Sequence, residues 1–92
     1  MLRREYNRFI VNASADLSGK GPLIVQDLCG RGAGVVGNFP LDINAPVEIT
    51  ISPCFAISNP VNIKARVAWC RQLENRLWQA GLDFGLTNEL TF

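Results

Sequence analysis

The sequence predicts an all-β fold, a small six-stranded antiparallel β-barrel with little or no helix. Apolar and polar residues alternate in several short segments, and turn-forming residues separate these segments at fairly even spacing. No stretch of ten or more residues has a convincing helical period. We expect a barrel rather than an open sheet because closure removes the exposed edge strands.

The clearest predicted strands lie in the second half of the chain. Residues 47–51 (VEITI) alternate strictly, residues 61–69 (VNIKARVAW) form the longest such run, and residues 77–84 (LWQAGLDF) form the third. The segment around Leu73 and Leu77 allows a turn or two of helix. The residues expected to point inward are Val47, Ile49 and Ile51, then Val61, Ile63, Ala65, Val67 and Trp69, then Trp78, Ala80, Leu82 and Phe84. For both tryptophans this pattern favours core packing over base stacking.

The first half of the chain predicts a hairpin and a further extended piece. Residues 8–15 and 22–28 are apolar runs that flank DLSGKG, a sequence suited to a tight turn between antiparallel strands. Residues 32–37 (GAGVVG) read as a short strand after the glycine-rich CGRG. The segment 38–46 holds two prolines and two asparagines, so we expect a loop there.

Length and charge limit what the protein can do. A chain of 92 residues makes one domain, and 48% hydrophobic with 18% charged residues is ordinary for a folded globular protein. Nine cations against eight anions leave a net charge of +1, which is too weak to hold nucleic acid or an anionic membrane by net charge alone. Any anion-binding site must therefore be local.

The cysteine pattern indicates neither a disulfide framework nor a zinc site. The three cysteines are Cys29, Cys54 and Cys70, with no C-x-x-C pair and no histidine in the chain. Reduced thiols fit a cytoplasmic protein, and we expect Cys54 and Cys70 to be inert packing or surface thiols. No segment approaches a transmembrane span, and the apolar run near the start is too short for a signal peptide. We expect no metal and no direct membrane insertion.

Two features point to a local site, and each also has a simpler interpretation. Arg4 and Arg8 lie in an N-terminal arm, where arginines are usually just solvated. Asp27 is followed by a glycine-rich stretch whose backbone could approach a ligand closely, or could merely turn a barrel corner. The aspartate itself could simply cap the turn.

Together these features resemble the two-part signature of PilZ domains. Arg4-x-x-x-Arg8 matches the first part, R-x-x-x-R, and Asp27-Leu28-Cys29-Gly30-Arg31-Gly32 matches the second, [DN]-x-S-x-x-G. The segments GAGVV, APVEITI, IKARVAW and AGLDF resemble later strands of the family. The resemblance implies a single PilZ-like domain over residues 1–92, with a mobile basic arm at 1–8, a barrel at 9–86 and a C-terminal tail at 87–92.

The resemblance implies a bacterial cyclic di-GMP receptor that needs no cofactor and catalyses nothing. Arg4 and Arg8 would grip phosphate or guanine edges, because the guanidinium fork matches both. The resemblance also implies that Asp27 accepts a hydrogen bond from the N–H edge of a guanine, and that Cys29 and Gly32 complete the binding loop. Arg3 and Arg31 are further candidates. Arg3 could favour a stacked pair of ligands or be solvated, and Arg31 could add positive potential.

One departure from the signature bears on affinity. Cys29 stands where the family usually has serine, and a thiol is the weaker hydrogen-bonding group. A second copy, from Asp16 to Gly21, keeps the serine as Ser18. We favour the Asp27 copy because the Asp16 copy follows Arg8 too closely to leave room for a hairpin before it.

Other functions remain open at this stage. A PilZ-like barrel with weak or no nucleotide binding could act as a protein interaction module, and Cys29 would suit it. An oligonucleotide-binding barrel would need exposed aromatic residues among basic ones. An enzyme is disfavoured, since there is no histidine, no serine near a base and no carboxylate pair at recognisable spacing. Expected partners are cyclic di-GMP and a downstream protein or adjoining domain, without DNA or RNA.

Overall fold

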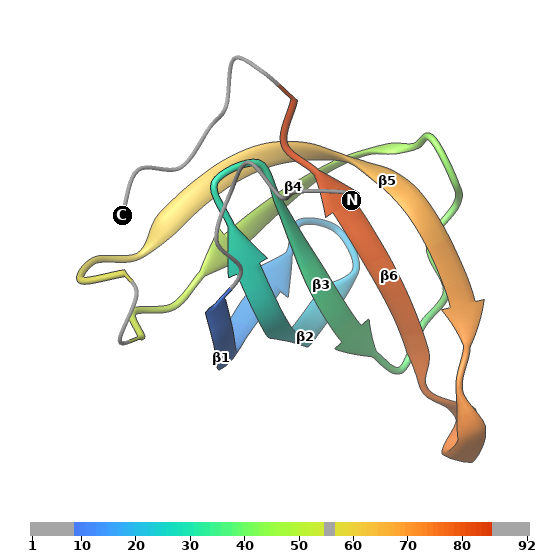
Figure 1. Cartoon of the computed structure of the whole chain (residues 1–92). Coiled ribbons are helices and arrows are strands. Elements are labelled where there is room, and N and C mark those ends of the chain that lie inside the picture. Colours follow the sequence, from blue (N-terminus) through green and yellow to red (C-terminus); the bar gives the residue numbers. More distant parts are fainter. Residues whose placement is uncertain (1–8, 55–56, 86–92) are drawn as a thin grey trace, which may run out of the picture.

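The computed structural model describes residues 9–54 and 57–85 and contains a closed six-stranded barrel. The strands are β1 (Phe9–Leu17), β2 (Gly21–Cys29), β3 (Gly32–Gly37), β4 (Pro46–Ile51), β5 (Val61–Gln72) and β6 (Trp78–Asp83). They follow the order β1-β2-β3-β6-β5-β4 around the barrel, each antiparallel to its neighbours (Figure 1). The predicted fold class is confirmed.

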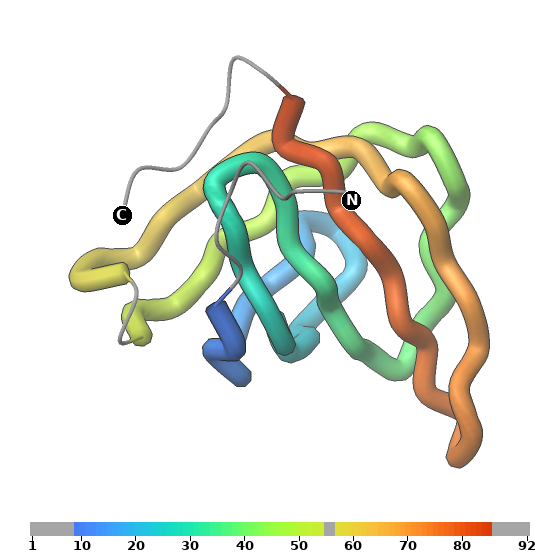
Figure 2. The backbone as a smooth tube through the Cα atoms, viewed as in Figure 1, coloured from blue at the N-terminus to red at the C-terminus, as the bar shows by residue number. Residues whose placement is uncertain are grey.

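The barrel closes through a short contact between β1 and β4. Three residue pairs join these strands, from Ala15–Ile51 to Leu17–Ile49, whereas β3 and β6 share six. The long strand β5 pairs with β4 along Val61–Arg66 and with β6 along Arg66–Gln72. The β5–β6 hairpin therefore extends beyond the rest of the barrel at one end (Figures 1 and 2).

The barrel interior is filled by the inward residues of all six strands. Most of the predicted inward positions are confirmed, because Ile49, Ile51, Ile63, Ala65, Val67, Ala80, Leu82 and Phe84 are all buried. Leu17, Val25, Leu28 and Val35 complete the centre of this core. Cys54 and Cys70 are partly buried against it, and all three cysteines are free thiols. No polar or charged residue is buried in the described part of the chain.

The register shifts at three places in the described strands. One shift lies between Ile10 and Ala13 on β1, and the other two are bulges between Val25 and Asp27 on β2 and between Val67 and Trp69 on β5. An extra residue in a strand reverses the side to which every later side chain points. Each bulge therefore changes which side chains reach the outer surface of the barrel.

The predicted inward position of Trp69 is wrong, and the β5 bulge is the reason. Trp69 is 43% exposed on the outer surface, although Val67 before it is fully buried. Trp78 lies on the same side of β6 as buried Ala80, but it is only partly buried where the hairpin extends from the barrel.

The loops between the strands lie where the turn-forming residues of the sequence predict them. Ser18 to Lys20 join β1 to β2, as predicted, and residues 38–45 form the expected loop, with Leu41 buried against the core. In place of the helical turn considered near Leu73 and Leu77, the chain forms a tight turn, η1 (Glu74–Arg76), at the tip of the β5–β6 hairpin, with positive φ at Asn75 and Arg76. Within the described ranges, no helix is long and apolar enough to cross a membrane.

Candidate functional site

Two pairs of residues share one row across the outer surface of the barrel. Asp27 on β2 is paired with Gly34 on β3, Gly34 with Gly81 on β6, and Gly81 with Trp69 on β5. We call Asp27, Gly34, Gly81 and Trp69 the glycine row. The two bulges place its end residues on the outside, so a carboxylate and an indole flank two glycines.

The glycines allow both end side chains to lie flat on the sheet. A Cβ at Gly34 would stand 2.9 Å from Oδ1 of Asp27, and a Cβ at Gly81 would stand 2.6 Å from Cε2 of Trp69. Both distances are shorter than van der Waals contact, so alanine at either position would displace its neighbour. The row thus depends on the absence of two side chains.

Asp27 is held in place by a backbone hydrogen bond. The N–H of Gly34 donates to Oδ1 of Asp27 over 3.1 Å, which fixes the direction of the carboxylate. A carboxylate can accept several hydrogen bonds, so this contact orients the group without using all of its acceptor capacity. Asp27 also lines a surface hollow of about 340 Å³ together with Gly32, Gly34, Trp69, Gln79 and Gly81.

The other predicted residues of the Asp27 copy lie at the β2–β3 turn. Gly32 lines the same hollow. It also packs closely against the backbone of β6, since a Cβ at Gly32 would come within 2.7 Å of the Leu82 carbonyl oxygen. Cys29 is partly buried, pairs with Gly32 and does not line the hollow. Arg31 lies in the turn, and its carbonyl accepts the N–H of Phe84 over 2.8 Å. These residues are therefore adjacent to the hollow rather than all within it.

The predicted arginines Arg3, Arg4 and Arg8 lie outside the described residues. The first described residues of β1 nevertheless fix where this arm joins the barrel. Phe9 is paired with Leu28 and Ile10 with Asp27, so β1 begins directly beside the Asp27 copy of the motif.

The Asp16 copy lies at the opposite end of the β1–β2 hairpin. Asp16 is paired with Pro22 near the turn, and Ser18 is an exposed turn residue whose N–H donates to the carbonyl of Glu48. The start of β1 and the Asp16 copy are thus separated by the length of that strand.

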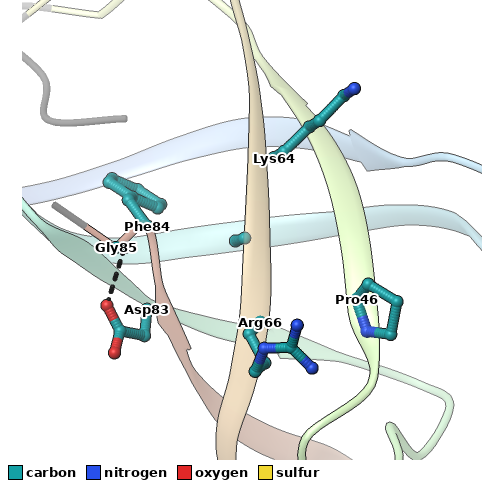
Figure 3. A pocket seen from close by; sticks show the side chains of 7 residues that line it. Pro46, Lys64, Arg66, Asp83, Phe84 and Gly85 are labelled. Atoms are coloured by element: carbon teal, nitrogen blue, oxygen red, sulfur yellow. Dashed lines mark hydrogen bonds between the residues drawn. The ribbon is translucent and has the colours of Figure 1, made fainter. Parts of the chain in front are cut away.

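A second hollow, of about 320 Å³, lies on the outside of β4, β5 and β6 (Figure 3). Its polar groups already have structural roles. Arg66 donates to the carbonyl of Asn44 over 2.6 Å, and the Asp83 carboxylate accepts the N–H of Gly85 over 2.8 Å. Lys64 extends away from the other lining residues and forms no hydrogen bond or ion pair with the described part of the chain. This hollow offers one uncommitted cation and an oriented carboxylate but no exposed aromatic ring, since Phe84 is buried, so we favour the first hollow.

Sequence reasoning missed three residues of the site. Gly34 and Gly81 lie in segments that resemble family strands, but sequence analysis assigned no site role to them or to Gln79, because that role comes from strand pairing across the barrel. Trp69 was assigned to the core by alternation. Its position in the sequence gives no sign of the bulge that turns it outward.

The described structure shows no cluster of metal-binding side chains. Among residues 9–54 and 57–85, no group of three or more cysteine, aspartate or glutamate side chains could hold a metal ion. The first hollow offers an oriented carboxylate and an exposed aromatic ring, each lying over a glycine. These groups suit a planar ligand with hydrogen-bond donors at its edge.

The fold is that of a small β-barrel domain with a hollow on the outside of its sheet. Comparison with known families is more specific. The PilZ domain model matches residues 2–91, so nearly the whole chain is covered, and the chain belongs to the PilZ domain family. The sequence-based resemblance is thereby confirmed.

A solved structure shares the fold. It is the inhibitor of motility MotI/DgrA of Bacillus subtilis, with a TM-score of 0.75 and 14% sequence identity. The match covers 92% of the present chain and 43% of that one, so this domain spans less than half of the larger protein. A search among curated proteins finds no match.

Proposed function

We propose that this domain is a cyclic di-GMP receptor module of bacterial signalling that binds its ligand on the glycine row and performs no catalysis. The observation that carries the proposal is the pairing of Ile10 with Asp27. This pairing puts the start of β1 beside the oriented carboxylate, which supports our expectation that Arg4 and Arg8, earlier in the chain, act at the same place as the Asp27 motif.

The chemistry of the ligand matches what this place offers. Cyclic di-GMP carries two phosphates and two guanines, and a guanidinium can donate paired hydrogen bonds to a phosphate or to guanine O6 and N7. The carboxylate of Asp27 can accept hydrogen bonds from the N–H edge of a guanine. The hydrogen bond that it accepts from the Gly34 N–H fixes its orientation. Gly34 leaves room for the Asp27 side chain to lie on the sheet, so its carboxylate lines the hollow where a planar base would bind.

We further propose that the protein works in the cytoplasm and passes the signal to a downstream protein or an adjoining domain. Ordering of the basic arm over the ligand would change the surface that such a partner meets. The ligand-binding role needs no cofactor and no nucleic acid.

A second candidate function is favoured by Cys29. A PilZ-like barrel whose motif serine is replaced by a thiol could bind nucleotide weakly and act as a protein interaction module. The thiol is a poor hydrogen-bond donor and acceptor, and it stands two residues from Asp27 on the same strand.

Calorimetric titration with cyclic di-GMP separates these functions, with GTP and cyclic GMP as controls. We expect saturable binding of cyclic di-GMP alone, together with amide NMR shifts at Asp27, Gly32 and Gly34 but not at Lys64. Absence of binding at high ligand concentration would reject the receptor function and favour the interaction module. Binding with shifts confined to Asp16 and Ser18 would reject the Asp27 site.

A further inference from the structure

A third hollow lies on the outer face of the barrel and is lined mostly by apolar side chains. It has a volume of about 410 Å³ and crosses β1, β2 and β3. One row of paired residues runs through it, in which Ser14 is paired with Ile24 and Ile24 with Val36. Ile24 is 42% exposed, and Leu77, which also lines the hollow, is 38% exposed. Neighbouring apolar side chains exposed to this extent are typical of a surface that contacts another protein.

A chain of polar side chains separates this hollow from the first one. Oε1 of Gln79 on β6 accepts from Nε of Arg71 over 3.0 Å and from Nη2 of the same arginine over 2.7 Å. Nε2 of Gln79 donates to Oε1 of Gln26 over 3.0 Å. Along β2, Gln26 lies between Ile24 in the third hollow and Asp27 in the first. The apolar surface is therefore bounded by a polar rim on the side of the candidate nucleotide site.

Charged side chains of opposite sign lie at the two ends of the third hollow. Asp16 on β1 is exposed and paired with Pro22, which lines the hollow at one end. Arg76 is exposed and directly precedes Leu77 at the other end, beside β6. The strand order β1-β2-β3-β6 puts these ends about 14 Å apart at the usual spacing of strands (Figure 1). Neither charged side chain forms a hydrogen bond or ion pair with the described part of the chain.

This arrangement is self-complementary. A two-fold rotation about the middle of the hollow exchanges its ends, so Asp16 of each copy would meet Arg76 of the other. The same rotation lays the two apolar rows against each other, which would remove Ile24 and Leu77 of both copies from water. The net charge of +1 adds little repulsion between two copies of the chain.

We propose that the third hollow is the contact surface between two copies of this domain in a weak two-fold dimer, with ion pairs between Asp16 and the partner's Arg76. A stable dimer buries about 800 Å² on each partner, and a surface that crosses only three short strands is smaller than this. We therefore expect reversible association with a Kd of about 50 µM. The inference does not depend on the proposed binding of cyclic di-GMP, because the polar rim separates the two surfaces.

Sedimentation velocity at protein concentrations from about 5 to 500 µM tests the dimer directly. Wild-type protein should change from monomer to dimer across this range. Ile24→Thr and Leu77→Ser should each weaken association about tenfold, because each removes apolar surface from both halves of the interface. Ile24→Thr keeps a β-branched residue on β2, and thermal unfolding of each variant verifies the fold.

An exchange of charges tests the two-fold arrangement. Asp16→Lys and Arg76→Glu should each weaken association about fivefold, because each replaces two symmetry-related attractions by repulsions. The double variant with both substitutions should associate like wild type, since the ion pairs form again with reversed sign. If the double variant associates no better than the single variants, the pairing of Asp16 with the partner's Arg76 is wrong.

The matched control is Ile43→Ser, which removes an exposed isoleucine outside the third hollow and should leave association unchanged. Wild-type protein that stays monomeric at every concentration would overturn the dimer and leave the hollow to a different protein. Dimerisation that survives both Ile24→Thr and Leu77→Ser would exclude this surface. A protein that dimerises as described but binds no cyclic di-GMP in calorimetry would reject the receptor function alone.

Discussion

Asp27 and Trp69 stand at opposite ends of one row of paired residues, and each folds over a neighbouring glycine. Each is also the residue that follows a β-bulge. Strict alternation from Val25 and Val67 would turn both side chains into the core, where a carboxylate would be costly to bury. The two bulges therefore build the hollow, because they bring a charged group and an aromatic ring to the same outer face.

The first prediction concerns Gly34, which makes room for Asp27. Gly34→Ala should weaken cyclic di-GMP binding about tenfold, because the added methyl would displace the carboxylate and its hydrogen bond from the Gly34 N–H. Calorimetric titration measures the loss. The stability cost should be small, since the Asp27 side chain lies on the surface and can move aside.

Gly32→Ala is the matched comparison two residues earlier on β3. Its methyl would meet the backbone carbonyl of Leu82, which cannot move independently of β6. We expect a loss of about 1 to 3 kcal/mol in the free energy of unfolding, as for other overpacked sites. Equal effects of both substitutions on stability, with no specific loss of binding at Gly34, would contradict the proposed role of the glycine row.

The second prediction concerns the two arginines of the basic arm. Arg4→Ala and Arg8→Ala should each reduce the free energy of cyclic di-GMP binding by about 2 to 3 kcal/mol, because each removes charge-assisted hydrogen bonds. Circular dichroism and thermal unfolding should match wild type. Unchanged calorimetric affinity in both variants would remove the arm from the binding site.

Much of the fold could be predicted from the alternation of apolar and polar residues and from the turn-forming residues between strands. The site could be predicted only in part. The alternation in VEITI and in IKARV defined buried positions such as Ile49 and Ile63 correctly, because these strands are regular. The bulges were missed because the inserted residues, such as Ala68, have no distinctive chemistry. Trp69 was misplaced for that reason. Asp27 and Gly32 could be found from the family signature, whereas Gly81 gains its role from a tryptophan twelve residues earlier, on the adjacent strand.

The third prediction concerns the replacement of the motif serine by Cys29. Cys29→Ser should tighten cyclic di-GMP binding about fivefold, because a hydroxyl forms stronger hydrogen bonds than a thiol and one neutral hydrogen bond contributes about 1 kcal/mol. Cys29 is only partly buried at the end of β2, so stability should change little. Calorimetry and thermal unfolding measure both quantities.

Ser18→Ala is the control for this substitution. Ser18 is exposed in the β1–β2 turn, far along β1 from the Ile10–Asp27 pair, and its loss should leave binding unchanged. The opposite result, in which Ser18→Ala weakens binding and Cys29→Ser has no effect, would transfer the site to the Asp16 copy.

The last prediction concerns the tip of the β5–β6 hairpin, where the backbone is strained. Asn75 and Arg76 both have φ of 63°, and the N–H of Leu77 donates to the carbonyl of Glu74 over 3.4 Å. Two successive left-handed residues are typical of a type I′ turn, in which asparagine followed by glycine is preferred. Asparagine tolerates this conformation, but for an arginine it costs about 1 to 2 kcal/mol. Arg76→Gly should therefore raise the free energy of unfolding by about 0.5 to 1 kcal/mol, after the greater chain entropy of glycine is subtracted.

Urea denaturation measures this change, and Glu74→Gly is the control because Glu74 has no positive φ. Glycine at Glu74 should lower the free energy of unfolding by roughly 0.5 to 1 kcal/mol, since it only adds entropy to the unfolded chain. Opposite signs for two glycine substitutions in one turn would locate the strain at Arg76. If Arg76→Gly destabilises the protein as Glu74→Gly does, the arginine side chain stabilises the hairpin by more than its backbone costs.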